Sequence, residues 1–121
     1  MRILIVDDDP FAGQVAAAIL EELGHDTMLC ENAPDAAAQL GEGGNVDLIV
    51  CDMNMPLISG IELFRELRAQ DCRIPFVLLS GDDPASLLAA EPGLDACVLK
   101  DGDLDNNLAR AVERIARPRA A

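Results

Sequence analysis

The sequence predicts an α/β fold in which a doubly wound, five-stranded parallel sheet is covered by five helices. Short apolar runs alternate along the chain with longer stretches in which apolar residues recur at helical spacing. Parallel strands need crossover connections, and the helices that form them cover both faces of the sheet. A length of 121 residues fits one domain, so residues 1–121 are expected to form a single domain.

Five short apolar runs supply the expected strands. Each is too short for a typical helix and is separated from the next by turn residues or a helical pattern. They are RILIV (2–6), DTMLC (26–30), VDLIVC (46–51), PFVLL (75–79) and ACVLK (96–100).

Three of the expected helices have a clear apolar stripe, because apolar side chains recur every three or four residues. Residues 33–40 and 84–90 have weaker patterns, and Pro92 cuts the second of them short. The stripes consist of Phe11, Val15, Ala18, Ile19 and Leu23, of Leu63, Phe64 and Leu67, and of Leu104, Leu108, Ala111, Val112 and Ile115.

Capping signals mark several helix ends. Asp9-Pro10 is typical of an N-cap followed by proline at the first helical position, and Gly24 ends that helix. Ser59 with Glu62 predicts a capping box, and Asp83-Pro84 repeats the first signal. These boundaries agree with the alternation of strands and helices.

Composition and charge exclude several classes of protein. With 50% hydrophobic and 26% charged residues, the chain reads as an ordinary globular protein rather than a disordered one. Nine basic and 22 acidic side chains give a net charge of −13, which repels nucleic acid and anionic lipid. We therefore expect neither nucleic acid nor a membrane as a direct partner.

The cysteines and the N-terminal segment indicate a reducing compartment. The four cysteines, Cys30, Cys51, Cys72 and Cys97, lack C-x-x-C spacing, which argues against zinc and disulfides. The apolar run before Asp7 is too short for a signal peptide or a membrane span. A cytoplasmic location is the expectation.

Polar residues follow four of the five expected strands. Asp7 and Asp8 follow the first, Asp52 the third, Ser80 the fourth, and Lys100 ends the fifth. The carboxyl ends of parallel strands meet at one edge of the sheet, which is where such folds bind ligands. Three acids, a hydroxyl and an ammonium are therefore expected to converge there.

The three carboxylates indicate a metal site beside a nucleophile. Carboxylates this close repel one another unless one is protonated or a cation lies between them. Oxygen ligands suit Mg²⁺, and a carboxylate beside it can accept a phosphoryl group. Asp52 is the best-placed nucleophile, with Asp7 and Asp8 holding the metal.

Some of these residues also have ordinary structural interpretations. Asp9 is best explained as a helix cap, and His25 as a surface residue. Taken singly, Asn54 and Ser80 are typical of turns and caps, and Lys100 of a solvated strand end. The functional interpretation therefore depends on the whole set at one sheet edge.

Four motifs, in order, give the chain a family resemblance. ILIVDDDP, DMNMPLISG, the LLSG after the fourth run and the VLK at the end of the fifth resemble the receiver domain of bacterial response regulators. The resemblance spans the whole chain and implies the flavodoxin-like (βα)5 receiver fold. It implies a two-component or phosphorelay switch, not a classical enzyme, phosphorylated by a sensor histidine kinase or a histidine phosphotransfer protein.

The resemblance also implies roles for individual residues. Asp52 matches the phosphoacceptor, and Asp8 and Asp7 match the acidic pair, Asp8 binding Mg²⁺ directly and Asp7 mainly through water. The backbone carbonyl of Asn54 would be a further ligand. Lys100 matches the lysine that pairs with a phosphoryl oxygen.

Three further positions follow from the same resemblance. Ser80 matches the hydroxyl residue that moves to bond the phosphoryl group, and Gly81 the small residue that leaves it access. The side chains of Asn54 and Asp82 lie where this family tunes dephosphorylation.

The chain departs from the commoner family pattern near its output surface. Cys97 stands where a Tyr or Phe usually reports phosphorylation, and Asp101 where many receivers have proline. The fourth helix is also expected to be short. We expect the domain to act on a downstream protein target or effector domain, and a phosphorylation-dependent homodimer is possible in this family. Because of these departures, the family's standard output mechanism cannot simply be carried over to this chain.

Three alternative functions are each distinguished from a phosphorylated receiver by a specific property. A degenerate receiver acting as a protein-interaction scaffold would be indifferent to Mg²⁺ and phosphodonors. A haloacid dehalogenase-type hydrolase generally needs a second acid where this chain has Asn54. A flavodoxin-like nucleotide-binding protein is disfavoured because the first strand lacks a glycine-rich phosphate loop and the chain has no Trp or Tyr.

Overall fold

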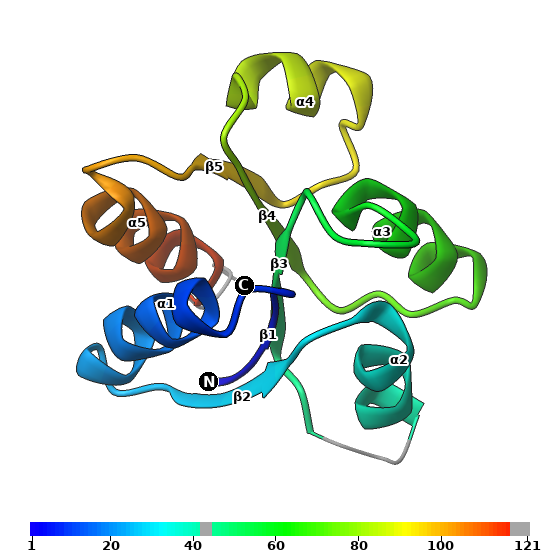
Figure 1. Ribbon diagram of the computed structural model, residues 1–121, viewed down its shortest axis with the longest axis horizontal. Coiled ribbons are helices and arrows are strands. Elements are labelled where there is room, and N and C mark those ends of the chain that lie inside the picture. Colours follow the sequence, from blue (N-terminus) through cyan, green and yellow to red (C-terminus); the bar gives the residue numbers. More distant parts are fainter. Residues whose placement is uncertain (42–44, 117–121) are drawn as a thin grey trace, which may run out of the picture.

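The computed structural model describes residues 1–41 and 45–116, in which strands and helices alternate without exception (Figure 1). The expected order of elements is therefore confirmed. The elements are β1 (Arg2–Val6), α1 (Pro10–Glu22), β2 (Asp26–Cys30), α2 (Ala33–Gly41), β3 (Leu48–Asp52), α3 (Gly60–Ala69), β4 (Phe76–Ser80), α4 (Pro84–Ala90), β5 (Ala96–Leu99) and α5 (Leu104–Ala116).

The strands form a single parallel sheet in the order β2-β1-β3-β4-β5. From β1 the chain first adds β2 on one side and then returns to add β3 on the other. The strand order thus reverses between β1 and β3, which is the place where open parallel sheets bind ligands. The doubly wound fold class is confirmed.

Helices cover both faces of this sheet, with α1 and α5 on one face and α2 and α3 on the other (Figure 1). Alternate residues of each strand enter the two layers, so that Ile3 and Ile5 pack toward α1 and α5 while Leu4 and Val6 pack toward α2 and α3. Strands that are buried on both faces have sequences that are apolar throughout, and the apolar runs of this chain fit that pattern.

The fourth helix is the least embedded element. α4 has seven residues, none of them buried, and it packs mainly on β5. Its shortness agrees with the expectation from Pro92. Figure 1 shows it standing beyond the β4–β5 end of the sheet.

The predicted caps are all present. Asp9 accepts a hydrogen bond from the Phe11 amide, and Asp83 accepts one from the Ala85 amide. Ser59 and Glu62 form a complete capping box. Gly24 follows Leu23, the C-cap of α1, and its φ of 92° is the left-handed conformation typical of a glycine that ends a helix.

The first two strands match the expected runs, and the other three differ from them by one or two residues at one end or both. β3 starts at Leu48 because Asp47 uses its side chain and its amide to bond the backbone of Arg2. β3 includes Asp52 and β4 includes Ser80, whereas Lys100 lies just past β5. The polar residues therefore sit on or next to the strand ends.

All four cysteines are free thiols. The peptide bond after Lys100 is trans. Within residues 1–41 and 45–116, no helix combines the length and the apolar character that a membrane span requires.

Candidate functional site

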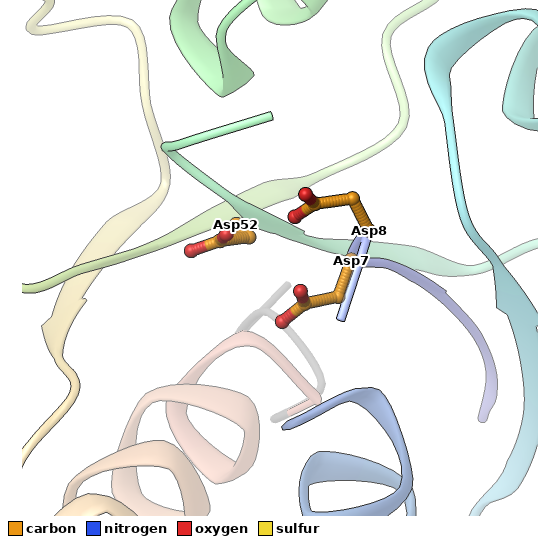
Figure 2. Close-up of side chains that lie close together, drawn as sticks. All are labelled: Asp7, Asp8 and Asp52. Atoms are coloured by element: carbon orange, nitrogen blue, oxygen red, sulfur yellow. The ribbon is translucent and has the colours of Figure 1, made fainter. Parts of the chain in front are cut away.

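Three carboxylates meet where the strand order reverses. Asp7 and Asp8 directly follow β1, and Asp52 is the last residue of β3. One carboxylate oxygen from each lies within 4.8 Å of the others. Figure 2 shows the three side chains close together beside the ends of the two strands.

A single ammonium group joins two of these acids. The Lys100 Nζ donates to Asp52 Oδ1 at 3.0 Å and to Asp7 Oδ2 at 3.2 Å. The Lys100 amide also bonds the carbonyl of Ser80 at 2.8 Å, which fixes the start of the side chain beside β4. The lysine therefore reaches across β4 to the acids of β3 and β1.

The acids differ in exposure. Asp7 and Asp52 are buried, with 4% and 6% of their surfaces exposed, whereas Asp8 is exposed. Asp7 is also held by the Asp9 amide, which donates to its other oxygen at 2.9 Å. The site is thus open to solvent on the side of Asp8 and closed on the side of the sheet.

Burial and neighbouring charges shift the pKa values of Asp52 and Lys100, which form the central ion pair. Burial raises the pKa of Asp52, the hydrogen bond from Lys100 opposes this, and the charges of Asp7 and Asp8 add to the increase. Burial acts to lower the pKa of Lys100, but Asp52 and Asp7 together raise it. Lys100 is therefore positively charged at neutral pH.

This donor set fits a hard divalent cation. Three carboxylates face one ammonium, so two negative charges are left without a cation when all of the acids are ionised. Oxygen-only donors, one of them exposed, suit Mg²⁺, which keeps several of its waters. The acidic triad is consistent with a Mg²⁺ site.

Ser80 borders the triad from the neighbouring strand. It is fully buried, and its Oγ accepts a hydrogen bond from the Asp82 amide at 3.0 Å. The register pairs Asp52 with Leu79, the residue before Ser80. Asn54, Gly81 and Asp82 follow in the exposed loops after β3 and β4 at the same sheet edge.

Sequence reasoning missed the part that Gly60 plays in holding this edge together. A Cβ at Gly60 would lie 2.6 Å from the carbonyl oxygen of Asp52 and 2.6 Å from Leu78 Cδ1. The Gly60 amide bonds the carbonyl of Met53 at 2.9 Å. α3 therefore begins directly against the strand end that carries Asp52. The available signal was a glycine just after the Ser59 cap, in a loop that must return to the sheet.

Cys97 lies away from the triad, in β5. It is half-buried and lines a groove of about 530 Å³ between α4 and α5. Pro84 and Leu88 of α4 line the groove on one side and Ala111 of α5 lines it on the other. The groove therefore runs along β5 beside Cys97.

The chain belongs to the response regulator receiver domain family, whose model matches residues 3–113. Receiver domains are phosphoacceptor modules of two-component signalling that partner histidine kinases, and they act as switches rather than as classical enzymes. This assignment excludes the hydrolase and nucleotide-binding alternatives. The acidic pocket of Asp7, Asp8 and Asp52 with Lys100 is the receiver's functional site.

Individual relatives support the same family. The chain is 34% identical over 126 residues to the transcriptional regulatory protein AruR of Pseudomonas aeruginosa, covering 99% of this chain and 51% of that protein. The chain thus spans about half the length of this relative.

Solved structures match over nearly the whole chain. The response regulator TrrA from Thermotoga maritima, crystallised in complex with Mg²⁺-BeF, superposes with a TM-score of 0.81 at 30% identity, covering 94% of this chain and 97% of that one. The signal receiver domain of a histidine kinase from Syntrophus aciditrophicus gives a TM-score of 0.81 at 32% identity, covering 99% and 96%.

Proposed function

We propose that residues 1–121 form one receiver domain that accepts a phosphoryl group on Asp52 and switches a protein-interaction surface. The donor is a phosphohistidine of a sensor histidine kinase or of a histidine phosphotransfer protein. The observation that carries the proposal is the position of Lys100, hydrogen-bonded to both Asp52 and Asp7 within a triad of carboxylates.

In this proposal Asp52 is the nucleophile. One of its oxygens is bound to Lys100, and a lone pair of the carboxylate attacks phosphorus while the phosphorus–nitrogen bond of the donor histidine breaks. The lysine keeps the carboxylate oriented and then pairs with an oxygen of the transferred group. The buried position of Asp52 at the end of β3 keeps the side chain in place.

Mg²⁺ would be held by Asp8, Asp52 and the backbone carbonyl of Asn54, with Asp7 mainly through water, and would neutralise charge on the phosphoryl oxygens. The exposure of Asp8 supports this arrangement, because a hydrated ion can reach it from solvent.

Ser80 would stabilise the product. Its Oγ now accepts from the Asp82 amide, which leaves the hydroxyl proton available for donation. A rotation toward Asp52 would place this proton on a phosphoryl oxygen, and Gly81 would leave the necessary room, because a Cβ there would meet no atom within 4 Å. The loop before α4 would move with Ser80.

The lifetime of the phosphorylated state would be set by Asn54 and Asp82, whose exposed side chains follow the strands that carry Asp52 and Ser80. Asn54 is an amide and cannot act as a general base. Hydrolysis should therefore be slow enough for the domain to serve as a switch.

The output would be read on the surface formed by α4, β5 and α5. The target is a downstream protein or effector domain, and a phosphorylation-dependent homodimer is compatible with this surface. We place the domain in the cytoplasm, a reducing compartment, in agreement with its four free cysteines. Its net charge of −13 argues against direct contact with nucleic acid or an anionic membrane.

Chemical trapping tests the assignment of Asp52. Borohydride reduces an aspartyl phosphate to homoserine, so peptide mass spectrometry after incubation with acetyl phosphate and Mg²⁺ should find homoserine at position 52. Asp9→Asn, which keeps a good helix cap, is the matched control and should still be modified. Homoserine at another aspartate would refute the assignment.

A further inference from the structure

The loop between β3 and α3 holds an apolar side chain almost entirely in solvent. Leu57 is 93% exposed, compared with 74% for Phe11, the next most exposed large apolar residue among those described. Its φ is 74°, and the Ile58 amide donates to the Pro56 carbonyl at 2.9 Å, which closes a three-residue turn around it. A turn of this kind with a positive φ is rare and strained for a bulky residue.

Leu57 lies at the edge of an apolar groove between α2 and α3. The two helices are neighbours on one face of the sheet (Figure 1), and the groove between them has a volume of about 270 Å³. Leu63 and Leu67 of α3 line it as buried residues, and Ala37 of α2 lines it as an exposed one. The groove has room for one or two apolar side chains.

The charge around the groove is of one sign. Among the described residues that line the groove, Glu66 carries the one charged side chain and none is Lys or Arg. Glu62, one turn earlier on α3, is exposed as well. The two arginines of α3 pair elsewhere, Arg65 with Glu91 and Arg68 with Asp95.

We propose that the groove between α2 and α3, with Leu57 at its edge, is a docking site for a basic amphipathic helix of a partner protein. Apolar residues at helical spacing would enter the groove and cover Leu57, while Lys or Arg side chains on the flanks of the helix would face Glu66. A second copy of this chain, with its own charge of −13, does not offer this complementarity.

The strain at Leu57 supports a role in binding. Asn or Gly would adopt the left-handed conformation at lower cost, and a polar residue would avoid exposing apolar surface. A leucine in this conformation gains little within the folded chain, because it is almost fully exposed. Burial beneath a partner would remove its side chain from water and offset the cost.

A synthetic amphipathic helix made of Leu and Lys is a suitable probe. Titrated into the isotope-labelled full chain at physiological salt, it should give saturable amide shifts confined to α2, residues 56–58 and α3. A peptide in which Glu replaces Lys should not bind. Shifts centred on α4, β5 and α5, shifts spread over the whole acidic surface, or equal binding of the acidic peptide would overturn the proposal.

Variants at exposed positions identify the contact. Leu57→Ala should lower the affinity for the probe about tenfold, since it removes most of the side chain that the helix would bury. Phe11→Ala removes an exposed apolar side chain from α1 and should leave the affinity unchanged. Leu57→Asn should also lose affinity while raising the midpoint of thermal unfolding. Unchanged affinity in both Leu57 variants would refute the docking site.

Discussion

The Lys100 ammonium donates a hydrogen bond of 3.0 Å to the Asp52 carboxylate, although 48 positions separate the two residues in the chain. The sheet order makes this contact possible, because β5 and β3 flank β4 and their carboxyl ends lie at one edge. The same ammonium binds Asp7. One cation thus contacts both buried carboxylates of the site.

The protonation of Asp52 should make stability fall with rising pH in the acid range. Its folded pKa is raised above the usual 3.8, first by burial, against the opposing bond from Lys100. The folded state therefore holds the proton more tightly than the unfolded chain, and this contribution is complete below about pH 3.8 and lost as pH passes the raised value.

Urea unfolding without divalent ions should reveal this contribution. The free energy of unfolding of the wild type, minus that of Asp52→Asn, is expected to decrease from pH 3.8 upward until the raised pKa is passed. A difference that is flat or that rises with pH would contradict the burial argument.

Replacement of Asp8 by Asn should weaken Mg²⁺ binding without destabilising the fold. Asp8 is exposed and repels the two buried carboxylates, so Asp8→Asn should raise Tm by about 2–5 °C in chelator. The increase in Tm that Mg²⁺ gives the wild type should be lost. Asp9→Asn is the control, because Asp9 caps α1, and its Tm should still respond to Mg²⁺. An equal Mg²⁺ response in both variants would show that Asp8 is not a ligand.

Gly60→Ala should disturb the strand end that carries Asp52. The new methyl group would lie 2.6 Å from a backbone oxygen and must push α3 away, at a cost of about 1–3 kcal/mol in the free energy of unfolding. Phosphorylation by acetyl phosphate should slow as well. Gly102→Ala, where a Cβ meets nothing within 4 Å, should behave as the wild type. Equal unfolding free energies for the two variants would be evidence against the close contact.

Cys97→Tyr should be tolerated and should report on phosphorylation. The groove of about 530 Å³ beside Cys97 can take the ring, so the free energy of unfolding should change by less than about 1 kcal/mol. The chain contains no Trp or Tyr, so this tyrosine would be its only strong intrinsic fluorophore. Its emission should change on addition of Mg²⁺ and acetyl phosphate. An unchanged emission in a fully phosphorylated sample would show that the surroundings of position 97 do not change on phosphorylation.

The fold was predictable because local signals and long-range pattern agree. Apolar runs of strand length, the caps at Asp9, Ser59 and Asp83, and the polar ends of strands each indicate the same alternation. The meeting of Asp7, Asp8, Asp52 and Lys100 then follows from parallel topology, since every carboxyl end of the sheet lies at one edge.

Contacts that depend on exact backbone paths were not predictable. The close approach of Gly60 to Asp52 arises from where α3 docks, and the sequence shows only a glycine after a cap. The turn at Leu57 is likewise invisible, because leucine gives no signal for a positive φ. The start of β3 at Leu48 was missed because Asp47 is bound to Arg2, a contact between distant segments.

The most direct test of the proposed function is intact-mass analysis of the full chain after incubation with acetyl phosphate, once with Mg²⁺ and once with chelator. A single labile phosphoryl adduct is expected only with Mg²⁺, and none is expected on Asp52→Asn. No adduct under either condition would contradict phosphoacceptor function and favour a receiver that acts only as an interaction scaffold. A stable adduct on the Asp52→Asn variant would show that the phosphoryl group goes elsewhere.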